Sequence, residues 1–180
     1  MQYLKDRGFV IRRVNFGDSD RYVTLFTQNH GKVELVAKGV RKITSRRTSS
    51  MELLNLVNFQ AVRTSKNFIL TEVVLLDSFQ HLKQELTHIQ KVFLMCELIE
   101  AALPHGSKHA DVFDLMLRAA EKVSENEKNM AYFQAKLLAL LGFWDDTVSF
   151  KNDDHVQRIF EQVIERKLKS PTAFTVGASV

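Results

Sequence analysis

The sequence predicts an α+β protein in two parts, a small five-stranded β-barrel over residues 1–80 followed by an all-α helical bundle over residues 81–180. Two observations lead to this prediction. As far as about residue 78, short β-branched and aromatic runs alternate with polar residues, which is typical of strands. From about residue 79 onward, apolar residues recur three or four positions apart, which is typical of amphipathic helices.

Five runs in the first part are predicted strands, because they are rich in Val, Leu, Phe and Thr and are separated by turn-forming residues. They cover residues 9–16, 21–27, 32–38, 54–63 and 68–76. Alternation is clearest in the third strand, where Val33, Leu35 and Ala37 share one face, and it recurs in the fourth over residues 57–61. Five strands that each have one apolar face close most economically into a barrel. The count is that of an OB-type barrel, a fold that often binds single-stranded nucleic acid.

Four helices are predicted in the second part, over residues 82–103, 110–123, 127–141 and 154–168. Pro104 and Gly106 end the first helix. Gly142 is the expected C-terminal cap of the third, and Asp153 or Asp154 is the expected N-cap of the fourth. The first helix carries two adjoining apolar stripes, one through Leu82, Leu86, Ile89, Phe93 and Cys96 and one through Val92, Met95 and Ile99.

The net charge of +4 is divided unequally between the two parts. Residues 1–80 hold thirteen Lys and Arg against seven Asp and Glu, a balance of +6, whereas residues 81–180 hold twelve against fourteen, a balance of −2. Positive charge concentrated in one part of a protein favours a polyanionic partner for that part.

The segment between the third and fourth predicted strands is the most basic stretch of the chain. Five cations fall within ten positions with no acidic residue among them: Lys38, Arg41, Lys42, Arg46 and Arg47. The Ser and Thr residues between and after them offer hydroxyl groups that also suit phosphate oxygens. Apolar anchors are missing, so we expect a mobile loop that lays its cations along a sugar–phosphate backbone. A basic, Ser-rich loop without a function is the alternative.

Further candidates lie on or beside the predicted strands. Cations that could extend a basic channel are Arg12, Arg13, Arg21, Lys32 and Arg63, although each could equally be an exposed residue of a sheet face. Candidates for stacking on bases are Phe16, Tyr22 and Phe26, although phenylalanine in a strand is more often part of the core.

Several classes of site and function are not expected. The single cysteine, Cys96, excludes disulfides within the chain and the usual multi-cysteine zinc sites. There is no phosphate-binding or dinucleotide-binding glycine motif and no recognisable catalytic spacing, so we expect neither an enzyme nor a bound cofactor or metal. The longest apolar run, residues 68–76, is too short to cross a bilayer, and the N-terminus lacks a signal peptide. A cytoplasmic protein that does not bind membranes is the expectation.

Four segments, GFVI at 8–11, GDSDRYVTLFT at 17–27, GKV at 31–33 and VAKGVRK at 36–42, resemble the N-terminal domain of the bacterial RecO family in order and spacing. AYFQAKLLALLGF at 131–143 and LKS at 168–170 are similar, more loosely, to its helical part. Many members are longer and carry a four-cysteine zinc module after the Leu-Gly-aromatic stretch. Here Phe150 and Lys151 lead almost directly into the last predicted helix, so zinc binding is not carried over.

The resemblance implies a recombination mediator that binds single- and double-stranded DNA and anneals complementary strands. It also implies action with RecR, and often RecF, to displace single-strand-binding protein and to load RecA. The basic loop would then hold phosphates with little base preference, and the helical part would dock partners. Two other functions stay open: an adaptor whose barrel and bundle bind proteins, and a chaperone of single-stranded RNA.

Overall fold

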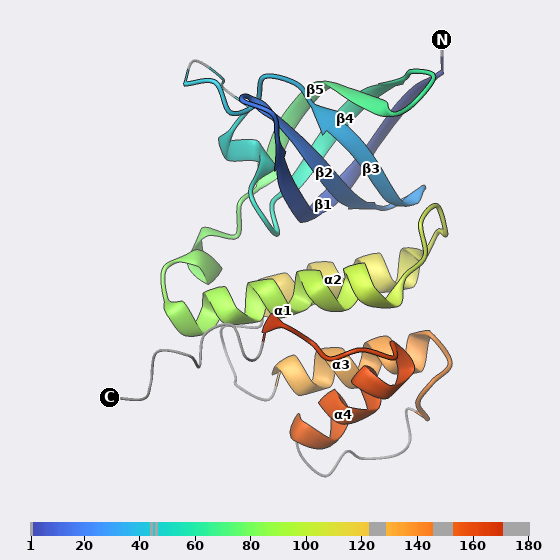
Figure 1. The fold of residues 1–180 in the computed structure, drawn as a ribbon. Helices are drawn as coiled ribbons and strands as arrows, with labels where there is room; N and C mark the ends of the chain where they lie inside the picture. The colour runs from blue at the N-terminus through green and yellow to red at the C-terminus, as the bar shows by residue number, and fades with distance from the viewer. Residues whose placement is uncertain (1, 44, 46, 123–128, 146–152, 171–180) are drawn as a thin grey trace. The chain divides into compact units, whose positions relative to one another are not determined.

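The computed structural model describes residues 2–43, 45, 47–122, 129–145 and 153–170 (Figure 1). The chain divides into two compact units. The first consists of Met1–Phe79 together with Leu103–His109, and the second consists of Gln80–Ala102 together with Ala110–Val180. Residues 103–109 thus group with the first unit, although they lie in sequence between two helices of the second.

The first unit contains a closed barrel with the strand order β1-β2-β3-β5-β4 (Figure 1). The strands are β1 (Tyr3–Phe16), β2 (Asp20–Thr27), β3 (Gly31–Ala37), β4 (Leu56–Arg63) and β5 (Phe68–Asp77). All neighbours pair antiparallel except β3 and β5, which pair parallel through Leu35 with Phe68 and Val36 with Ile69. The predicted five-stranded OB-type barrel is confirmed.

Strand β1 is longer than the sequence predicted, because it begins at Tyr3 rather than Phe9. Its first half pairs with β4 and its second half with β2, and the register shifts between Val10 and Arg12. Such a bulge bends a strand, which lets one strand serve two neighbours in a closed barrel. The sequence did not predict a strand over residues 3–8, because two of the buried positions there are Asp6 and Gly8 and so the apolar residues do not alternate with polar ones.

The barrel core confirms the faces that the sequence assigned to the third and fourth strands. The buried cluster includes Val33, Leu35, Ala37, Val57, Phe59 and Ala61. Val40 and Met51, which lie between β3 and β4, also belong to this cluster, and neither has any exposed surface. The expectation that the segment between those strands lacks an apolar anchor was therefore wrong, because the burial of Val40 is a tertiary contact with no periodic pattern around it.

Residues 103–109 lie against the start of β3. The amide of Gly106 donates a hydrogen bond of 3.1 Å to the carbonyl oxygen of Lys32, and Lys32 forms a parallel bridge with His105. At Gly31, where φ is +66°, an added Cβ would lie only 2.1 Å from the carbonyl oxygen of Ser107. Position 31 therefore requires glycine both for its backbone conformation and for this close approach.

Four α-helices lie in the described residues of the second unit, as predicted. They are α1 (Leu86–Ala102), α2 (Ala110–Lys122), α3 (Asn129–Leu140) and α4 (Asp153–Val163), with a short 3-10 helix over Gln80–Lys83 ahead of α1. Helix α3 contacts both α2 and α4. Gly142 has φ +81°, and the amide of Phe143 donates to the carbonyl oxygen of Leu138, so the predicted C-terminal cap is confirmed.

Of the two stripes predicted on the first helix, the one through Val92, Met95 and Ile99 is buried. Leu86 and Phe93 of the other stripe are exposed. Within the described ranges, no helix combines the length and the apolar character that crossing a bilayer requires.

Two carboxylates of the second unit hold the segment that follows α4. Glu161 accepts hydrogen bonds from Lys167 Nζ at 2.6 Å and from the amide of Leu168 at 3.1 Å. Burial alone would raise the pKa of Glu161, but these hydrogen bonds outweigh it and lower the pKa. Glu97 of α1 accepts the amide of Ser170 at 2.8 Å, so residues 167–170 are fixed to the helices.

Candidate nucleic-acid interface

The basic loop, residues 38–50 apart from 44 and 46, begins against the turn between β1 and β2. The amide of Gly39 donates to Asp20 Oδ1 at 2.7 Å. The backbone amide of Arg41 donates a hydrogen bond of 2.9 Å to the carbonyl oxygen of Ser19. The side-chain Nη1 of Arg41 donates one of 3.0 Å to the carbonyl oxygen of Gly17. These hydrogen bonds, together with buried Val40, fix the start of the loop to the barrel.

Hydrogen bonds within the basic loop also close its base. Arg47 Nη2 donates to the carbonyl oxygen of Lys38 at 3.0 Å. The hydroxyl of Thr48 donates to the carbonyl oxygens of Ser45, at 3.1 Å, and of Val40. The two ends of the described loop are therefore held together, and residues 41–43 are left exposed beyond them.

The exposed part of the basic loop carries positive charge that no carboxylate of the described residues neutralises. Lys38, Arg41 and Lys42 are exposed, and in the part of the chain that the structure describes no ion pair engages their side chains. Arg47 is half-buried. Arg46, the remaining cation predicted for this loop, lies outside the described residues. Uncompensated cations of this kind can attract phosphates without first breaking an ion pair.

The cations predicted on the strands have different surroundings. Arg13 and Arg21 both pair with Glu52, with Arg21 Nη1 3.3 Å from Glu52 Oε1. Arg12 Nη1 lies 3.8 Å from Glu34 Oε1. Lys32 is buried. The structure therefore compensates or buries these four charges within the barrel, whereas it exposes those of the basic loop.

A cavity of about 370 Å³, here called the Tyr22 cavity, opens on the outer face of β2, β3 and β5. Its floor includes Tyr22, Val36 and Ile69, which are successive partners across the three strands. Lys38 of the basic loop and Lys66 of the turn between β4 and β5 both line it. In OB-type barrels, this strand face and the loops beside it bind oligonucleotides.

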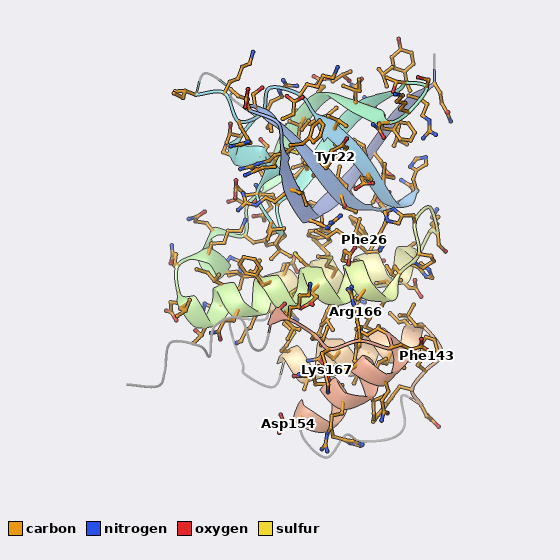
Figure 2. The ribbon with its side chains drawn as sticks, in the orientation of Figure 1. Tyr22, Phe26, Phe143, Asp154, Arg166 and Lys167 are labelled. Carbon is orange, nitrogen blue, oxygen red and sulfur yellow. The ribbon has the colours of Figure 1, made fainter. Side chains whose placement is uncertain are left out.

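Two of the three predicted stacking residues line the Tyr22 cavity. The rings of Phe16 and Tyr22 meet edge to face, with their centroids 4.9 Å apart. Tyr22 is labelled in Figure 2. Phe16 is 53% exposed and Tyr22 is half-buried, so both rings can be reached by a ligand. Phe26 is fully buried and offers no face for stacking.

The turn between β4 and β5, residues 64–67, also lines the Tyr22 cavity, although its sequence predicts only a connection between two strands. The hydroxyl of Thr64 donates to the carbonyl oxygen of Asn67 at 2.7 Å, and the amide of Thr64 donates to the same oxygen at 2.8 Å. This tight turn presents the exposed side chain of Lys66 at the cavity edge. A lone lysine in a Ser- and Asn-containing turn gave no sign of this role, because only the pairing of β5 with β3 brings the turn beside Tyr22.

Comparisons with known proteins agree with this architecture. Residues 1–79 match the family model described as the N-terminal domain of recombination protein O. A protein of Symbiobacterium thermophilum named DNA repair protein RecO is 32% identical over 140 residues, which cover 76% of this chain and 55% of the relative.

Two further relatives carry the same name. The protein of Rubrobacter xylanophilus is 29% identical over 147 residues, covering 79% of this chain and 59% of the relative. The protein of Chloroherpeton thalassium is 29% identical over 145 residues, which cover 77% of this chain and 56% of the relative. The chain thus spans little more than half the length of these relatives. With an OB-type barrel that matches the N-terminal family model and relatives that align through most of its length, the chain belongs to the RecO family.

Proposed function

We propose that this chain acts in DNA repair and recombination by binding DNA, with single strands held in the Tyr22 cavity and along the basic loop. One observation carries the proposal. An accessible pair of aromatic rings, Phe16 of β1 and Tyr22 of β2, lines the same cavity as Lys38 and Lys66. In the described residues, no carboxylate pairs with either lysine. Rings that stack on bases and cations that hold phosphates are what single-strand binding requires.

Strand annealing follows from the same chemistry and needs no catalytic group. Cations that neutralise phosphates lower the repulsion between two strands, and base pairing then supplies the free energy of annealing. Duplex DNA would bind through the basic loop alone, because its bases are already stacked on one another. The proposed cellular role is mediation of recombination with RecR, and with RecF, single-strand-binding protein and RecA, as the family membership suggests.

The proposal is tested by binding of fluorescent oligonucleotides to the purified chain and by annealing of complementary strands. We expect binding of single-stranded DNA that weakens steeply with salt, and faster annealing in the presence of protein. A preference for RNA over DNA of the same sequence would favour an RNA chaperone. No binding of any oligonucleotide at low salt would overturn the proposal and leave a protein-binding adaptor.

Replacing Tyr22 by alanine is expected to weaken single-strand binding about tenfold, since stacking of a base on an aromatic ring contributes roughly 1–3 kcal/mol. The dependence of the affinity on salt should stay as in the wild type, because no charge is removed. Binding of blunt duplex DNA should change little. The matched control is Tyr132→Ala, which removes a tyrosine that is 59% exposed in α3 of the second unit. Equal losses for both variants would argue against stacking on Tyr22.

A further inference from the structure

A second cavity, here called the Tyr3 cavity, lies in the first unit on the other side of the turn between β4 and β5. Its volume is about 590 Å³. Tyr3 at the start of β1, Asn29 and His30 of the turn between β2 and β3, and Gly106 of the 103–109 segment all line it. Lys66 and Asn67 line both this cavity and the Tyr22 cavity, so the two share one wall.

The strand register shows that the two cavities follow one path over the barrel. Tyr22 pairs with Val36, Val36 with Ile69, Ile69 with Val62, and Val62 with Tyr3. This row of cross-strand partners begins at Tyr22, which lines the Tyr22 cavity, and ends at Tyr3, which lines the Tyr3 cavity. Neighbouring strands lie about 4.8 Å apart, so four such steps span roughly 19 Å. A single strand of a few nucleotides can cover that distance.

The Tyr3 cavity has the same chemical character as the Tyr22 cavity. Tyr3 is 68% exposed, and the guanidinium of Arg63 lies over the ring of Phe68, with Cζ 4.8 Å from the ring centroid. The exposed Lys66 also lines the cavity, as does the buried Lys32. Among the described lining residues Glu34 is the one aspartate or glutamate, and it pairs with Arg12. An accessible ring beside an excess of cations suits a base and its phosphate.

We propose that the single strand bound in the Tyr22 cavity continues past Lys66 into the Tyr3 cavity, where Tyr3 stacks on a base and Arg63 holds a phosphate. This inference rests on the proposed function and extends it, because it assigns a second set of contacts that only longer strands can reach. The Tyr22 cavity and the basic loop suffice for a short strand.

The test measures affinity for oligothymidylates of increasing length, from about two nucleotides, which are too short to reach both cavities, to about sixteen, the upper end of the site sizes of single OB folds. The variants are Tyr3→Ala and Arg63→Gln, and the control is Lys5→Ala, which removes an exposed cation of β1 that lines neither cavity. For the longest oligonucleotide we expect a loss of about fivefold or more from Tyr3→Ala. Arg63→Gln should lower the slope of log affinity against log salt by about 0.7. Both variants should bind the shortest oligonucleotide like the wild type.

The outcomes separate this inference from the proposed function. If the wild type binds oligonucleotides and Tyr22→Ala weakens that binding, but Tyr3→Ala and Arg63→Gln are neutral at every length, the continuous path is wrong and the proposed function stands. Equal losses at every length would also overturn the path, because a short strand would then already occupy the Tyr3 cavity. Wild-type affinity that stops rising at the shortest lengths is a third contradicting result, and it needs no variant.

Discussion

Replacing Lys38, Lys42 and Lys66 together by alanine is expected to weaken binding of single-stranded DNA by on the order of a hundredfold at low salt. Each lost contact between a cation and a phosphate is assumed to cost about 1 kcal/mol or more. The slope of log affinity against log salt should fall by about 2, since each contact with a single strand contributes roughly 0.7. Titration of a labelled oligonucleotide at several salt concentrations measures both quantities.

The control for this variant removes equal charge elsewhere. Lys5, Arg118 and Lys122 are exposed and lie outside both the basic loop and the Tyr22 cavity. Their combined replacement by alanine lowers the net charge by the same amount, so it reports any general effect of charge on association. If both triple variants lose the same affinity and the same slope, Lys38, Lys42 and Lys66 have no special role in the contact with DNA.

Arg47 is left in place because its guanidinium donates to the carbonyl oxygen of Lys38 and closes the base of the loop. Arg41 is left in place because it has two roles. Its amide and its guanidinium hold the turn between β1 and β2, so alanine at this position would disturb the start of the loop as well as remove a charge. Arg13 and Arg21 are left for a similar reason, since they share Glu52 and their loss would leave that carboxylate without these partners. A binding defect is interpretable only for cations that have no structural partner.

The sequence predicted those parts of the fold that depend on local pattern. The alternation at Val33, Leu35 and Ala37 predicted a buried face, and the structure confirms it. Gly142 predicted a helix end in the same way, because a C-terminal cap depends on one residue and its neighbours. Patterns of this kind are visible in a single segment.

The features that the sequence missed depend on contacts between distant segments. Val40 is buried because the loop returns to the barrel core, and no periodicity marks it. Lys66 lines both cavities because β5 pairs with β3, which the turn sequence alone does not reveal. The exclusion of Phe26 as a stacking residue has the same origin, since a strand pattern cannot tell a phenylalanine in the core from one on the surface.

Asp6 is a buried carboxylate of β1 that no local sequence pattern marks. Its side chain is 2% exposed, and it accepts hydrogen bonds from the amide of Asn29 at 2.9 Å and from the amide of Arg7 at 2.8 Å. It also lies 2.7 Å from Nδ1 of His30. Asn29 and His30 line the Tyr3 cavity, so this one carboxylate fixes a wall of that cavity to β1.

Replacing Asp6 by alanine is expected to lower the free energy of unfolding by about 2–4 kcal/mol, since the variant loses several hydrogen bonds to a buried carboxylate and each hydrogen bond to a charged group contributes roughly 1.5–3 kcal/mol. Urea unfolding followed by circular dichroism measures the loss. Hydrogen exchange at the amide of Asn29 provides a local readout, because the variant should lose protection there before the rest of the barrel does. The control is Asp18→Ala, which removes an exposed carboxylate from the turn between β1 and β2. Retained protection at Asn29 in the Asp6 variant would contradict the proposed role.

The contribution of Asp6 to the free energy of unfolding should also depend on pH. The groups around Asp6 determine whether this contribution rises or falls with pH. Burial would raise the pKa of Asp6, but hydrogen bonds from His30, Asn29 and Arg7 outweigh it and lower the pKa in the folded state. The unfolded chain therefore binds the proton more readily, so the contribution of Asp6 is complete above about pH 4, near the pKa of an unfolded aspartate, and is lost as the pH falls further. The difference in stability between wild type and Asp6→Asn should accordingly be largest near pH 7 and narrow below pH 4. If the difference in the free energy of unfolding between wild type and Asp6→Asn stayed constant from pH 7 to pH 3, the charge of Asp6 would not be what holds the turn between β2 and β3.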